Sequence, residues 1–153
     1  MCPDKERCGV SLEKLNRAGE DYLKAILILQ RKNGSARSLD IAKLLDVSKP
    51  SVSVAVKLLR EGGFLIMDED KHICLTDIGR ETAEVVYEKH RVLSECLIAM
   101  DVDSDTADQD ACRMEHIVSP ETIEKMKIFL DKGTEKCRKE QKRNIVSPCR
   151  RSS

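Results

Sequence analysis

The 153-residue sequence has no tryptophan and only four other aromatic residues. Its 41% apolar content is still enough to bury a core, in one compact domain or two small ones. It contains no run of about 18 apolar residues, the length that spans a bilayer, and its N-terminus lacks the features of a signal peptide. We therefore expect a cytoplasmic protein that does not bind membranes.

Cysteine is present, but without the patterns of a structural site. The seven cysteines are odd in number and include no C-x-x-C pair. Because cytosolic thiols stay reduced, the sequence indicates neither a disulfide framework nor a four-cysteine zinc site. Most of these cysteines are expected to be small buried or surface residues.

Net charge is also absent, but the charges are segregated along the chain. Residues 31–63 hold seven basic and three acidic residues, residues 101–116 hold six acidic residues and one arginine, and residues 132–153 hold eight basic and two acidic residues. A polyanion partner for the first segment and a cation for the second are the natural interpretations. The alternative is that each segment is simply a solvated surface.

The first third of the chain has the pattern of a helix-turn-helix. Apolar residues at helical spacing predict a helix over residues 13–32, ended by the Asn-Gly-Ser of residues 33–35. We expect Ser38 to cap a short second helix that ends in a turn at residues 46–47. Ser48 should cap a third helix, with Pro50 in its first turn and a glycine pair at residues 62–63 marking its end.

The third predicted helix has two adjacent faces. At about 100° per residue, one stripe is apolar and comprises Val52, Ala55, Val56 and Leu59. The neighbouring stripe is polar and cationic, as a helix in the DNA major groove requires for base edges and phosphates. The predicted DNA-binding residues are Ser48, Lys49, Pro50, Ser51, Ser53, Lys57 and Arg60. An ordinary amphipathic helix pair is the alternative.

Two β-rich runs follow this helix, at residues 64–67 and 72–75, around a polar turn. They predict the hairpin wing of a winged helix-turn-helix domain over residues 12–76. A mainly helical domain is predicted over residues 77–143, with flexible segments at residues 1–11 and 144–153. Its helices run from residue 76 to about 100, across the "DACRMEHIV" segment of residues 110–118, and from Ser119 to Leu130. The first of these has an apolar stripe, which includes His90, at a spacing suited to packing and to a dimer.

The second of these helices carries metal-ligating side chains on one side. Counted at helical spacing, the four possible ligands fall within a sector of about 100°, beside an apolar stripe of Ala107, Ala111, Met114 and Val118. Carboxylate, imidazole and thiolate together suit a first-row transition metal better than Ca²⁺ or Mg²⁺. These ligands are Asp108, Cys112, Glu115 and His116.

A winged helix followed by "EKHRVLSECL" and "DACRMEHIVSPETIEK" resembles the diphtheria-toxin-repressor family of metal-dependent transcription regulators, over about residues 12–132. The resemblance implies a non-enzymatic homodimer that binds a palindromic DNA operator, with regulatory Fe(II) or Mn(II) held between a DNA-binding and a dimerisation domain. It also implies a two-domain form without an SH3-like domain. The metal ligands carried over by this resemblance are Asp21, His90, Cys112, Glu115 and His116, with Asp108 where some iron-type members place a further histidine.

The sequence departs from the family pattern at three positions. Lys24 stands where manganese-type members carry a ligating glutamate, Ser94 where a carboxylate serves an ancillary site, and Val54 where some relatives contact bases. Two other functions stay open, a redox-sensing repressor that uses cysteine thiols and a winged-helix adaptor that binds protein. A metalloenzyme is less well supported, because the sequence offers no separate general base or substrate loop.

Overall fold

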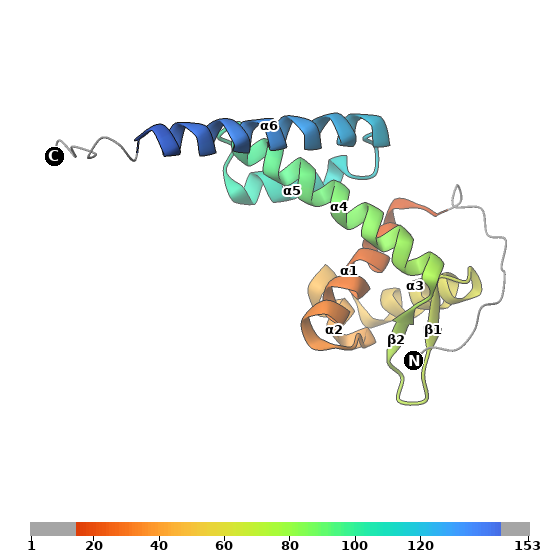
Figure 1. Cartoon of the computed structure of the whole chain (residues 1–153). Coiled ribbons are helices and arrows are strands. Elements are labelled where there is room, and N and C mark those ends of the chain that lie inside the picture. The colour runs from red at the N-terminus through yellow and green to blue at the C-terminus, as the bar shows by residue number, and fades with distance from the viewer. Residues whose placement is uncertain (1–14, 145–153) are drawn as a thin grey trace. The chain divides into compact units, whose positions relative to one another are not determined.

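The computed structural model describes residues 15–144, and the side chains of residues 15–133 (Figure 1). The chain divides into two compact units, residues 1–88 and 89–153, with the boundary inside the fourth helix. The predicted flexible segments at residues 1–11 and beyond Asn144 lie outside the described residues. The elements are α1 Arg17–Asn33, α2 Ser38–Leu45, α3 Lys49–Glu61, β1 Leu65–Met67, β2 Ile73–Leu75, α4 Asp77–Ala99, α5 Ser104–Met114 and α6 Pro120–Asn144.

Local capping signals set most helix ends in the first unit. α1 begins after Asn16, whose side chain accepts a hydrogen bond from the backbone N–H of Gly19 at 2.9 Å. It ends at Gly34, whose φ of 78° lies in the left-handed region that glycine adopts without strain. The Ser48 cap of α3 is confirmed, because its side chain accepts from the N–H of Ser51. The predicted Ser38 cap is wrong: Arg37 is the N-cap of α2, and it makes no side-chain cap hydrogen bond.

The predicted hairpin wing is present. β1 and β2 pair antiparallel, with Ile66 opposite Cys74. A third segment joins this sheet at one point, where the N–H of Ile73 donates to the carbonyl of Ala36 at 2.8 Å. Aliphatic side chains from all three helices and both strands form one core beneath the wing, including Leu23, Ile41 and Val52. The winged helix-turn-helix predicted from the sequence is confirmed.

The second unit consists of the end of α4 together with α5 and α6. Its core contains Val92, Leu93, Cys96, Ala111 and Ile123. The predicted end of α6 at Leu130 is wrong, since the helix continues through Gly133 to Asn144. A single glycine costs a helix only about 1 kcal/mol relative to alanine, which is too little to end α6 at this position. No helix in the described part of the chain is long and apolar enough to cross a membrane.

Candidate metal centre and nucleic-acid interface

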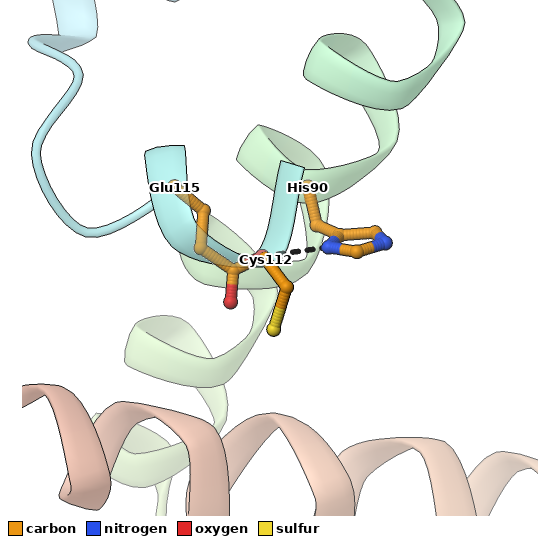
Figure 2. A group of neighbouring side chains, drawn as sticks. All are labelled: His90, Cys112 and Glu115. Atoms are coloured by element: carbon orange, nitrogen blue, oxygen red, sulfur yellow. Dashed lines mark hydrogen bonds and ion pairs between the residues drawn. The ribbon is translucent and has the colours of Figure 1, made fainter. Parts of the chain in front are cut away.

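Three possible metal ligands converge in the second unit (Figure 2). His90 lies on α4, Cys112 lies on α5, and Glu115 is the C-cap residue of α5. One ligand atom from each residue lies within 4.8 Å of the ligand atoms of the other two. The α4–α5 packing around Leu93 and Ala111 holds these side chains together.

His90 lies between two carboxylates. Its Nδ1 is 2.8 Å from Oε2 of Glu115, and its Nε2 is 2.8 Å from Oδ1 of Asp108. Glu115 is only 1% exposed, whereas the Asp108 side chain is 69% exposed. A buried carboxylate is costly unless hydrogen bonds or a cation compensate it. With imidazole, carboxylate and thiol together, the donor set fits a first-row transition metal.

His116 approaches this cluster from a turn rather than from the helix. α5 ends at Met114, so the prediction of a continuous helix through Val118 is wrong. The His116 side chain is 4% exposed, and its Nε2 lies 3.4 Å from Oε1 of Glu115. The turn therefore brings its imidazole beside the buried carboxylate that also contacts His90.

The remaining ligand expectations concern both units. Asp21 lies half-buried on α1 in the first unit, so its role as a ligand stays a prediction. Lys24 is buried on the same helix. Glu95, the carboxylate next to Ser94, pairs with Arg91 at 2.7 Å on the exposed side of α4. That arginine already compensates the charge of Glu95, so Glu95 is a weaker candidate for an ancillary metal ligand.

The predicted DNA-binding face of α3 is exposed. Val52, Val56 and Leu59 are buried, which turns the neighbouring polar stripe outward as expected. All seven predicted DNA-binding residues are exposed to solvent. Lys57 lies 4.0 Å from Glu61 in an exposed pair, and such a pair is weak enough for the lysine to exchange partners.

One polar network in the first unit was not anticipated from the sequence. It links Arg37, at the start of α2, to His72 and Asp68 in the wing. The backbone N–H of His72 donates to Asp68 at 2.8 Å, and this hydrogen bond lowers the pKa of the Asp68 carboxyl below its usual value. Arg37 and His72 lie 35 positions apart, so no local pattern could have paired them.

Comparison with known proteins links the candidate metal centre and the candidate DNA-binding face to one protein family. Residues 14–73 match the family model described as iron dependent repressor, N-terminal DNA binding domain, and residues 76–143 match iron dependent repressor, metal binding and dimerisation domain. The chain is 32% identical over 124 residues to the uncharacterized HTH-type transcriptional regulator MJ0568 of Methanocaldococcus jannaschii, which covers 80% of this chain and 99% of that protein.

Two further relatives are similar over the same region. The transcriptional regulator MntR of Escherichia coli O157:H7 is 34% identical over 113 residues, which are 74% of this chain and 73% of MntR. The solved structure of the manganese regulator SloR matches with a TM-score of 0.67 at 32% identity. That match covers 74% of this chain and 53% of the SloR chain, so this chain spans about half the length of SloR.

Proposed function

The chain belongs to the iron-dependent repressor family, and from this premise we propose that it represses transcription by binding a palindromic DNA operator when Fe(II) or Mn(II) is bound. The family supplies a DNA-binding domain followed by a metal-binding and dimerisation domain. We place the functional division between residues 76 and 77, and the protein in the cytoplasm as a homodimer without enzymatic activity and without a membrane partner.

The observation that carries this proposal is the His90, Cys112 and Glu115 cluster (Figure 2). Its donor atoms are close enough together to share one ion, and its carboxylate is buried. A bound divalent cation would stabilise this buried carboxylate in addition to its contact with His90. We include His116 and Asp108 in the ligand set, because each lies beside a member of the cluster.

The proposed control of DNA binding depends on ligands from both domains. Asp21 belongs to the DNA-binding domain, whereas Cys112, Glu115 and His116 belong to the dimerisation domain. Ligation of one ion by residues of both domains would restrict their relative orientation. In a twofold dimer, the two α3 helices must be about 34 Å apart to enter successive major grooves. Restricting the orientation raises the fraction of molecules that can bind DNA. The free energy of operator binding then becomes more favourable by the coupling free energy between metal binding and DNA binding.

The test is fluorescence anisotropy on a palindromic promoter fragment, titrated with Mn²⁺ or with anaerobic Fe²⁺. We expect chelator to weaken binding at least about tenfold, the size of a typical coupling of about 1.4 kcal/mol. Glu115→Gln should remove most of the metal dependence, because it takes away an anionic ligand at the buried position. Glu95→Gln, which changes an exposed carboxylate on α4, is the matched control and should leave the metal dependence intact. Affinity that does not change on chelation would show that the metal-dependent mechanism is wrong.

A further inference from the structure

The polar network between α2 and the wing contains an arginine whose partner carries no negative charge. Arg37 Nη2 lies 3.0 Å from Nε2 of His72, and Nδ1 of His72 lies 3.0 Å from Oδ2 of Asp68. Arginine can only donate hydrogen bonds, so Nε2 of His72 must accept. The proton of a neutral imidazole is then on Nδ1, which donates to Asp68. The two neighbours of His72 therefore orient its ring, with Nε2 toward Arg37 and Nδ1 toward Asp68.

This arrangement differs from that of two other arginines, which lie beside carboxylates. Arg31 pairs with Glu84 at 3.4 Å and also lies over the ring of Tyr87, while Arg91 pairs with Glu95. Those carboxylates offset the charge of their arginines. The imidazole instead orients the guanidinium of Arg37, and the His72 ring separates it from the Asp68 carboxylate.

The place of Arg37 in the fold suits contact with a phosphate. It is the exposed N-cap residue of α2, the first helix of the helix-turn-helix. In this motif the first helix crosses the DNA backbone, and helix N-termini and arginine side chains are frequent phosphate contacts. The pairing of Ala36 with Ile73 fixes the backbone on both sides of the network, so Arg37 and His72 stay adjacent.

The charge of the wing strengthens the argument. Its turn carries Asp68, Glu69 and Asp70 against Lys71, so the tip of the wing repels phosphates more than it attracts them. The hydrogen bonds from His72 engage the carboxylate of Asp68. Lys71 is surrounded in the sequence by these acidic residues, whereas Arg37 contacts the wing at His72, next to the turn, and adds a second cationic group there.

We propose that Arg37 is a DNA-phosphate contact and that His72, oriented by Asp68, is the residue that positions it. The proposal rests on the function proposed above, since it assumes that α3 and α2 lie on operator DNA. It adds a phosphate contact outside α3. It also gives the wing the role of orienting a DNA-contacting side chain of the helix-turn-helix. It also predicts two separable effects, one on the salt dependence of binding and one on the coupling between two side chains.

The first measurement is operator affinity against salt concentration in the full-length protein with Mn²⁺. Arg37→Ala should weaken binding severalfold and reduce the slope of log K against log [salt] by about 0.9, the value for one lost phosphate contact. Arg31→Ala is the matched control, because its guanidinium lies over the ring of Tyr87 as well as beside Glu84, and it should leave the slope unchanged. Lys57→Ala, on the exposed face of α3, should lower the slope as Arg37→Ala does.

The second measurement is a double-mutant cycle between Arg37 and His72. His72→Ala should weaken binding in the wild-type background and have no further effect in the Arg37→Ala background. His72→Gln should restore part of the affinity, because its amide oxygen can accept from Arg37. A purely structural role of His72 would give equal losses in both backgrounds and no rescue by glutamine.

The outcomes separate this proposal from the one on which it rests. If wild-type binding requires metal and Lys57→Ala lowers the slope, but Arg37→Ala does not, then Arg37 is not a phosphate contact and the repressor function stands. Equal losses on His72→Ala in both backgrounds would overturn its positioning role. A wild-type protein that binds no DNA with any of the metals would overturn both proposals.

Discussion

Cys112 and Asp21 are the two proposed ligands that differ most in chemistry. Cys112 is a soft thiolate ligand once it is deprotonated, and it lies beside His90 and Glu115. Asp21 is a hard oxygen ligand on α1. Thiolate coordination gains more with Fe²⁺ than with Mn²⁺, which stands lowest in the order of divalent affinities. The proposed ligand set is therefore a hybrid that favours Fe²⁺ slightly and still accepts Mn²⁺.

Exchanging either ligand should change the preference between the metals. We expect Cys112→Glu to improve Mn²⁺ relative to Fe²⁺, because every ligand is then oxygen or nitrogen, and Asp21→Met to act in the opposite direction. The measurement is the ratio of the Mn²⁺ and Fe²⁺ concentrations that half-activate DNA binding, with Glu95→Gln as control. If neither exchange alters that ratio, Asp21 and Cys112 do not set the selectivity together.

Among the elements, the wing and α4 meet at a closely packed junction. The Thr76 hydroxyl donates to the carbonyl of Gly63 at 2.7 Å and accepts from the N–H of Gly79 at 3.2 Å. A Cβ on Gly79 would lie 2.0 Å from the carbonyl oxygen of Phe64. The start of α4 thus packs directly on the backbone that leads into β1, and only glycine permits this approach.

Two glycines in helices should therefore respond in opposite ways to alanine. Gly79→Ala should destabilise the protein by more than about 2 kcal/mol, because backbone atoms must move to admit the methyl group. Gly133→Ala should stabilise α6 by up to about 1 kcal/mol, since its Cβ meets no described atom within 4 Å. Urea unfolding followed by circular dichroism compares them. A Gly79→Ala protein as stable as the wild type would show that the junction is looser than described.

For the whole molecule, the family assigns dimerisation to the second domain. Several large apolar side chains of the second unit are exposed, and exposed apolar surface is a candidate for association with a partner. Phe129 on α6 is 65% exposed, which is unusual for a phenylalanine on a protein surface. Between residues 89 and 133, the exposed large apolar residues are Ile98, Met100, Ile117, Ile128 and Phe129.

Phe129→Glu should weaken the dimer, because it places a charge where an aromatic side chain would be buried against the partner. A central aromatic contact is worth about 2 kcal/mol, so the dimer dissociation constant should rise roughly 30-fold. Sedimentation velocity over a concentration series measures this change. Leu44→Glu, at an exposed apolar position on α2, is the matched control and should remain dimeric. If the dimer dissociation constant of Phe129→Glu is unchanged, the dimer interface does not include that part of α6.

The sequence by itself determined the features that depend on neighbouring residues. The Ser48 cap, the turn at Asp46, the hairpin wing and the exposed stripe on α3 all follow from local spacing and residue type. Capping, turn conformation and amphipathic periodicity act over a few positions, so short patterns record them. The kinds of possible ligand in the "DACRMEHIV" segment were likewise readable from the chain.

Only the tertiary structure decided which distant groups meet. The packing of α4 on α5 brings His90 between Glu115 and Asp108, 25 and 18 positions away, and the wing brings His72 to Arg37. Helical spacing also did not predict that α5 ends at Met114, which places His116 in a turn. These distances depend on how whole elements pack, and the free energy of that packing comes from many apolar contacts spread over the core. For this reason residue type and spacing indicated possible metal ligands, whereas the grouping of His90 with Cys112 and Glu115 followed only from the family resemblance, and the packing of α4 on α5 brings these three side chains together.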